Sequence, residues 1–245
     1  MWTYPTIIAH RGGGSLAPEN TLAAFECGFN LGFRAVEFDV MLTKDLIPVV
    51  VHDEELGRTI AGKGLIGETW SRDLFQLDAG SWFAPEFANI RVPSFQQVLA
   101  FCTKHGIWMN VEIKPAKGYE EITGKIVAEV TRDFYANCTL PLPLFSSFAL
   151  DALAVAQSVA PHIPRGVLFD QVPADWLARL REFEAVSLHT NHKYLTPELA
   201  GAIKQAGAGL SCYTVNDPVR AREIMEWGVD AVFTDNLKLI PADFV

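Results

Sequence analysis

Short apolar runs alternate with longer segments of helical periodicity along almost the whole chain. The apolar, β-branched runs predict strands at 6–9, 35–40 with a continuing arm 47–52, 108–113, 142–146, 165–169, 185–189, 209–215 and 231–234. The helical segments between them are 21–31, 95–105, 120–134, 149–159, 174–181, 197–205 and 219–227. Alternation of this kind is typical of βαβ units with a parallel sheet. Eight such rounds predict an α/β fold of the (β/α)₈ TIM barrel type.

Residues at the predicted helix boundaries support these elements. Ser94, Thr196 and Asp217 stand where an N-cap side chain is expected, and Pro197 and Pro218 follow in the first turn. The length of 245 residues suits one barrel, and no linker or change of composition divides the chain. We therefore expect a single domain over residues 1–245.

Residues 53–94 interrupt the alternation. This segment holds several glycines, has weak periodicity and is far longer than an ordinary connection between elements. Its aromatic side chains, Trp70, Trp82, Phe83 and Phe87, are too many for a solvated tail, so the segment is expected to be a small folded insertion after the second strand. In a TIM barrel, a loop that follows a strand lies over the end where active sites are built.

The composition excludes several classes of protein. The formal net charge is −9 without a basic stripe, which argues against a nucleic-acid partner. An anionic substrate would need a local positive site. The four cysteines form no C-x-x-C pair, and the chain has no signal-like start and no membrane-length apolar run. These features predict a cytoplasmic protein without disulfides or stable membrane insertion.

Charged residues occur inside two of the predicted strands. Residues two apart in a strand face the same side, so Glu37 and Asp39 point together, as do Asn110, Glu112 and Lys114. Unpaired carboxylates in a parallel sheet are costly, and something must neutralise them. An oxygen-rich set from neighbouring strands suits a hard divalent cation, Mg²⁺ or Ca²⁺, better than zinc.

The alternative for these carboxylates is a structural salt-bridge cluster with Lys114 and Arg11, or a solvent-exposed strand end. The charges favour an anion site if the side chains converge. Three carboxylates, two cationic side chains and one divalent ion leave a net charge of +1, which a phosphodiester of charge −1 would cancel.

Two histidines end predicted strands at the same barrel end as the carboxylates. His10 closes the first strand, and His52 closes the arm of the second. Two imidazoles supply what phosphodiester cleavage requires, a base for the attacking oxygen and an acid for the leaving alkoxide. The alternative is that both are structural. His189 and His192, which flank the end of the sixth strand, are further candidates for the mouth of the site.

The glycines after the first strand allow an interpretation from another class. Residues 12–17 match the G-x-G-x-x-A fingerprint of dinucleotide-binding folds, and Glu37 follows at a suitable distance. However, Pro18 stands where the Rossmann helix should already run, so the helix is expected to start near Asn20. The glycines then serve a sharp turn and a close approach to a ligand.

Taken together, these motifs resemble the glycerophosphodiester phosphodiesterase family, in the cytosolic bacterial branch. The resemblance rests on the ordered strings His10-Arg11-Gly12-Gly13, Pro18-Glu19-Asn20-Thr21, Glu37-Phe38-Asp39-Val40, His52-Asp53, Arg58-Thr59, Val92-Pro93, Glu112-Ile113-Lys114, Ser147-Phe148, Thr214-Val215-Asn216, Gly228-Val229-Asp230 and Thr234-Asp235. The family has a (β/α)₈ barrel with an inserted segment after the second strand.

The resemblance implies roles for individual residues. The metal ligands would be Glu37, Asp39 and Glu112, the acid–base pair would be His10 and His52, and the phosphate would be bound by Arg11 and Lys114. One departure is Tyr213, which stands where family members often carry tryptophan and is expected to line the glycerol or leaving-group side.

The implied reaction is metal-dependent hydrolysis of a glycerophosphodiester to sn-glycerol 3-phosphate and an alcohol. In the mechanism usually proposed, the substrate's 2-hydroxyl attacks phosphorus, and water opens the resulting cyclic phosphate. The enzymatic alternatives are a lysophospholipase D acting on lysolipids and a phosphodiesterase that stops at the cyclic phosphate. A phosphate-ester binding protein without turnover is the alternative from another class.

Overall fold

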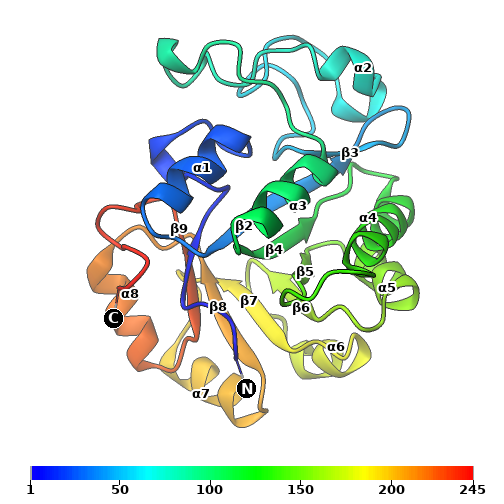
Figure 1. Cartoon of the computed structure of the whole chain (residues 1–245). Helices are drawn as coiled ribbons and strands as arrows, with labels where there is room; N and C mark the ends of the chain where they lie inside the picture. The colour runs from blue at the N-terminus through cyan, green and yellow to red at the C-terminus, as the bar shows by residue number, and fades with distance from the viewer. Residues whose placement is uncertain (1, 245) are drawn as a thin grey trace.

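Eight parallel strands form a closed barrel in the computed structural model, which describes residues 2–244 (Figure 1). The strands are β1 (Ile7–Ala9), β2 (Ala35–Leu42), β4 (Trp108–Ile113), β5 (Leu144–Ser147), β6 (Arg165–Phe169), β7 (Ser187–Asn191), β8 (Gly209–Tyr213) and β9 (Ala231–Thr234). Each strand pairs with the next along this series, and β1 pairs with both β9 and β2, which closes the ring. The predicted TIM barrel is confirmed.

Seven α-helices surround the barrel: α1 (Leu22–Asn30), α3 (Phe95–Lys104), α4 (Glu120–Tyr135), α5 (Leu150–Val159), α6 (Trp176–Glu182), α7 (Pro197–Gln205) and α8 (Pro218–Glu226). The predicted N-caps are confirmed, since the side chains of Ser94, Thr196 and Asp217 each accept a hydrogen bond from a backbone N–H of the first turn. Residues 235–244 follow β9 with turns rather than a helix.

The predicted arm of the second strand folds back on it. The strand β3 (Pro48–Val50) pairs antiparallel with β2, with Leu42 opposite Pro48 and Val40 opposite Val50. The backbone N–H of Val51 then donates to the carbonyl of Asp39 at 3.0 Å. This hairpin returns the chain to the level of Asp39, and it is the reason that His52 lies beside the carboxylates.

The segment between β3 and α3 has a small core of its own. It contains η2 (Ile66–Glu68), α2 (Ser71–Leu74) and η3 (Pro85–Phe87) and lies beyond β3 and α3, at one end of the barrel (Figure 1). Its buried apolar side chains form a cluster with β2 and β3 residues: Met41, Val49, Val51, Ile60, Ile66, Leu74, Ala79 and Val92. This packing gives the segment a fixed shape over the end where the strands terminate.

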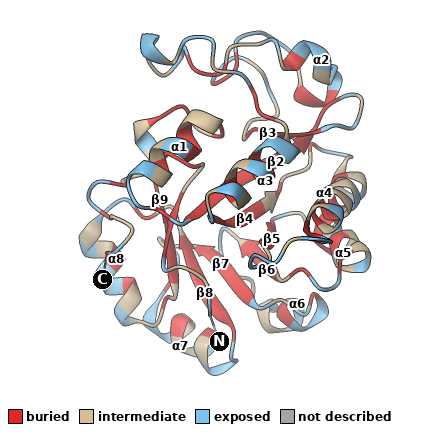
Figure 2. Ribbon diagram, in the orientation of Figure 1, coloured by how far each residue is buried: buried red, intermediate tan, exposed pale blue. Residues whose placement is uncertain are grey.

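The barrel interior changes character along the strands. The first inward positions are apolar, and an inner cluster of buried residues includes Ala35, Trp108, Leu144 and Ala231. Tyr4 stacks on Trp108 with ring centroids 4.5 Å apart and covers this amino-terminal end of the barrel. The later inward positions carry the polar side chains, and these strands are buried throughout most of their length (Figure 2). The carboxylates of β2 and β4 therefore lie toward the carboxyl-terminal end of the barrel.

Candidate active site

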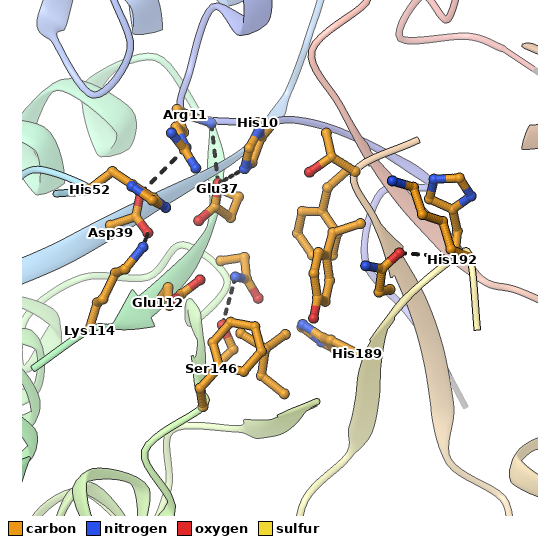
Figure 3. A pocket seen from close by; sticks show the side chains of 18 residues that line it. His10, Arg11, Glu37, Asp39, His52, Glu112, Lys114, Ser146, His189 and His192 are labelled. Carbon is orange, nitrogen blue, oxygen red and sulfur yellow. Dashed lines mark hydrogen bonds and ion pairs between the residues drawn. The ribbon is translucent and has the colours of Figure 1, made fainter. Parts of the chain in front are cut away.

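Three carboxylates meet at the carboxyl-terminal end of the barrel. Glu37 and Asp39 lie on β2, and Glu112 lies on β4 directly opposite Asp39 in the parallel register. One carboxylate oxygen from each residue lies within 4.8 Å of the others (Figure 3). Carboxylate oxygens at this spacing are the donors that Mg²⁺ and Ca²⁺ prefer, so the residues present fit a hard divalent cation.

Burial and mutual repulsion shift the pKa values of these carboxyls. Burial, reinforced by the neighbouring carboxylates, raises the pKa of Glu37 well above its usual range and that of Glu112 to about 8. Burial alone would also raise the pKa of Asp39, but the charges of Lys114 and Arg11 outweigh it and lower that pKa to about 2. Two of the three carboxyls therefore lack enough positive charge from the protein, and a bound cation would supply it.

A salt-bridge cluster accounts for only one of the three carboxylates. The Lys114 Nζ lies 3.2 Å from Asp39 Oδ1, and the Arg11 Nε lies 3.8 Å from Asp39 Oδ2. Glu37 accepts a hydrogen bond from the backbone N–H of Arg11 at 3.2 Å, but over residues 2–244 neither Glu37 nor Glu112 forms an ion pair with a lysine or arginine. The structural alternative thus explains Asp39 and leaves the two glutamates unneutralised.

His10 forms a pair with the aspartate that directly follows the last strand. Its Nδ1 lies 2.6 Å from Asp235 Oδ1, and its Nε2 lies 3.7 Å from Glu37 Oε2. The amide of Asn216 donates to the other oxygen of Asp235 at 3.0 Å. The carboxylate fixes the ring orientation through Nδ1, so Nε2 is the nitrogen that faces the carboxylate cluster.

His52 forms a second pair of the same kind. Its Nδ1 lies 2.8 Å from Asp53 Oδ1, and Asp53 also accepts a hydrogen bond from Arg58. Burial lowers the pKa of His52, although the charge of Asp39 opposes this shift. The neutral imidazole, which can accept a proton, is therefore favoured.

One cavity of about 410 Å³ contains all eight side chains that the sequence singles out. The charged groups of β1, β2 and β4 occupy one wall, whereas His189 and His192 approach from the opposite side (Figure 3). Apolar groups also line the cavity, including Phe148, Leu168 and Phe233. The carboxylate cluster therefore lies on one side of the cavity, and the rest of its lining mixes apolar groups with polar ones such as Lys193.

The candidate residues at the mouth have different environments. The Tyr213 hydroxyl donates to the carbonyl of Phe169 at 2.9 Å, so the ring rather than the hydroxyl is presented to the cavity. His189 is fully buried, which lowers its pKa to about 3 and keeps it neutral. Trp82 and Phe83 line a neighbouring cavity of about 720 Å³ that shares His10 and Arg11 with the first. His189 and His192, the further candidates for the mouth, both line the first cavity.

The glycine-rich turn after β1 brings two distant loops together. Gly14 has φ +54°, and a Cβ there would lie 2.3 Å from the carbonyl oxygen of Asp235. The helix α1 begins only at Leu22, after the N-cap Thr21. The turn therefore does not lead directly into a helix, and the Rossmann interpretation is wrong.

Sequence reasoning missed the groups that hold the reactive side chains in place. Asn20 donates to Asp39 Oδ2 at 2.9 Å, and Glu19 accepts from Arg11 and Arg58. A signal was available for Asp235, because it ends the last strand, which must lie beside the first in a closed barrel. No comparable signal pointed to the contacts of Arg58.

The protein is a TIM barrel whose carboxylate cluster is flanked by two histidine–aspartate pairs. A barrel of this class is suited to metal-assisted acid–base chemistry. The family model described as the glycerophosphoryl diester phosphodiesterase family matches residues 10–239. The chain belongs to this family.

Relatives match along nearly the whole chain. A protein named glycerophosphodiester phosphodiesterase from Caldanaerobacter subterraneus is 34% identical over 235 residues, which cover 94% of this chain and 93% of that protein. The solved structure of an Oleispira antarctica phosphodiesterase, in complex with the product sn-glycerol-3-phosphate, has a TM-score of 0.90 at 36% identity and covers 97% of this chain and 96% of its own. A glycerophosphodiester phosphodiesterase structure from Agrobacterium tumefaciens has a TM-score of 0.81 at 27% identity, covering 96% and 98%.

Across residues 2–244, the helices are all too short or too polar to cross a membrane.

Proposed function

We propose that the protein hydrolyses small glycerophosphodiesters to sn-glycerol 3-phosphate and an alcohol. The observation that carries this proposal is the carboxylate cluster of Glu37, Asp39 and Glu112, placed in one cavity with His10 and His52. Support comes from the Oleispira relative, whose structure was determined with sn-glycerol-3-phosphate as product.

The proposed metal ligands are Glu37, Asp39 and Glu112. A divalent cation, Mg²⁺ or Ca²⁺, would lower the pKa of the substrate's 2-hydroxyl and offset charge that develops on the phosphoryl group. The cation and this chain's own charges would together match the single negative charge of a phosphodiester.

The remaining charged residues act on the phosphate and on the protons. Arg11 and Lys114 bind the phosphoryl oxygens, because both cationic groups line the cavity beside the cluster. One of His10 and His52 accepts the proton of the 2-hydroxyl, and the other donates a proton to the leaving alkoxide. The substrate's 2-hydroxyl oxygen thereby bonds to phosphorus, the alcohol leaves, and water opens the cyclic phosphate.

A comparison of substrates tests this function. Glycerophosphocholine and glycerophosphoethanolamine are expected to be hydrolysed in the presence of Mg²⁺ or Ca²⁺, and the 2-deoxy analogue of glycerophosphocholine is expected to be almost inert because it lacks the nucleophile. The measurement is release of alcohol and of sn-glycerol 3-phosphate. Comparable hydrolysis of both compounds would mean that water attacks phosphorus directly.

The same assay separates the rival activities. The apolar groups of the cavity, together with the aromatic residues Trp82 and Phe83, offer contacts for an acyl chain. A strong preference for lysophosphatidylcholine would favour the lysophospholipase D alternative, and accumulation of a cyclic phosphate would indicate an enzyme that stops after the first step. Binding without turnover would support the binding-protein alternative.

We also propose that residues 53–94 are an insertion within one barrel domain that spans residues 1–245. The supporting observation is that the apolar side chains of this segment share one buried cluster with residues of β2 and β3. The cytoplasmic location stays a prediction from the sequence.

Metal binding is expected to depend on pH. The cation requires ionised carboxylates, whereas the pKa of Glu112 is about 8 and that of Glu37 is also raised. Metal affinity should therefore rise as the pH increases toward 8, and binding at pH 7 should release protons. Calorimetric titration with Mg²⁺ in two buffers of different ionisation enthalpy measures this release. Equal heats in both buffers would show that the carboxyls are already ionised.

A further inference from the structure

Arg58 joins the segment 53–94 to the loop that follows β1. Its guanidinium donates through NH1 to Glu19 Oε2 and through NH2 to Glu19 Oε1, each at 2.8 Å, and through Nε to Asp53 Oδ2. The pair with Glu19 is bidentate, which is the strongest geometry for an arginine and a carboxylate. One side chain of the inserted segment therefore holds two carboxylates at once.

Each of these carboxylates also contacts a residue of the proposed mechanism. Asp53 Oδ1 lies 2.8 Å from His52 Nδ1, and Glu19 Oε1 accepts from Arg11 NH1 at 2.7 Å. Arg58 thus stands at the middle of a continuous series of contacts with a proposed acid–base group at one end and a proposed phosphate ligand at the other.

The two carboxylates that Arg58 holds are more buried than Arg58 itself. The exposed fraction of the side chain is 46% for Arg58, 25% for Asp53 and 14% for Glu19. The two carboxylates therefore lie in a partly desolvated environment, where fixed partners determine their positions more strongly than water does. The arginine itself reaches no atom of the carboxylate cluster and lies outside the cavity that contains it.

We infer that Arg58 is a positioning residue that aligns His52 through Asp53 and Arg11 through Glu19, and so makes the inserted segment a working part of the site. This inference rests on the proposed function of His52 and Arg11. Its chemistry requires a guanidinium, because nitrogens in one plane make the bidentate pair with Glu19 and also reach Asp53, whereas the single nitrogen of a lysine cannot reproduce that bidentate pair.

The two arms of the series predict separable kinetic effects. Asp53→Asn should mainly lower kcat, since it loosens His52, and Glu19→Gln should mainly raise KM, since it loosens Arg11. Arg58→Gln should do both, with a change of roughly 10-fold or more in kcat/KM, as is typical when a group that orients a reactive residue is lost. The matched control is Arg72→Gln, which changes an exposed arginine of the same segment and should leave both constants unchanged.

Rescue distinguishes positioning from a merely structural role. Arg58→Ala should regain activity when guanidinium is added at millimolar concentrations, whereas Arg58→Lys should remain impaired. The melting temperature and Mg²⁺ affinity of each variant should stay close to those of the wild type, because the segment keeps its own apolar cluster and the metal ligands are untouched.

The outcomes of these experiments test the role of Arg58 separately from the proposed function. If Arg58→Gln keeps kcat and KM within about twofold of the wild type, Arg58 positions nothing. If activity falls only in proportion to a lowered melting temperature, and added guanidinium restores neither the activity nor the melting temperature, the role of Arg58 is structural and the inference is wrong. In both cases an active wild-type enzyme leaves the proposed function standing, whereas an inactive wild type on every glycerophosphodiester would contradict that function itself.

Discussion

Replacing His10 or His52 by alanine is expected to lower kcat by at least about a hundredfold, the lower limit of what a positioned acid or base contributes. Each imidazole is held through Nδ1 by an aspartate and lies in the cavity of the carboxylate cluster. The measurement is steady-state hydrolysis of glycerophosphocholine at saturating substrate. The matched control is His162→Ala, because that histidine is exposed in a turn before β6, at the other end of the strands.

The double variant of His10 and His52 sharpens this expectation. Because the two groups act in one proton-transfer scheme, removing both should cost little more than removing either. Independent, multiplying losses would show that they serve separate steps. Turnover near that of the wild type in one single variant would remove that histidine from the mechanism.

Glu112→Gln is expected to abolish stimulation by Mg²⁺ or Ca²⁺ and to reduce turnover to the level seen with a chelator. The amide keeps the volume of the carboxyl but loses the charge that a hard cation requires. Hydrolysis rates measured across a metal titration test this, with Glu121→Gln, an exposed residue of α4, as the control. Full activity of metal-free wild-type enzyme would contradict the metal site.

The same variant should remain folded. The pKa of Glu112 is raised from its ordinary value of 4.5 to about 8, so the folded protein binds this proton more tightly than the unfolded chain. For the metal-free wild type, the stabilisation linked to this proton is full below pH 4.5 and declines as the pH rises toward 8. Glutamine cannot ionise, so the metal-free variant should melt no lower than the wild type at pH 8. A lower melting temperature would show that the Glu112 charge stabilises the fold.

The alternation of polar and apolar residues was sufficient to predict the barrel and to place the three carboxylates on its strands, although their convergence was an assumption. A period of two residues determines that Glu37 and Asp39 share a face, and parallel strands bring Glu112 to the same end. The strands 108–113, 165–169 and 231–234 were predicted with the bounds that the structure has. The strand bounds and the shared face of the carboxylates depend on residues close together in the sequence or on adjacent strands. The pattern of polar and apolar residues therefore predicts them.

Contacts between distant segments could not be predicted in the same way. The return of β3 depends on a hairpin whose pairing partner is not encoded in the periodicity, and the bridge from Arg58 to Glu19 depends on how the inserted segment docks. The hydrogen bond of the Tyr213 hydroxyl to the carbonyl of Phe169 cannot be predicted from the sequence, because it depends on the relative positions of β6 and β8.

The pairing of β1 with β9 determines when the site can form during synthesis. His10 and Asp235 are separated by 225 positions, so the carboxylate that holds Nδ1 of the histidine is made long after the histidine itself. Until β9 arrives, β1 also presents an open sheet edge, a template on which other chains can aggregate. A chain terminated before β9 should therefore be an aggregation hazard without partial activity, and the final strand completes the fold and the reactive histidine in a single event.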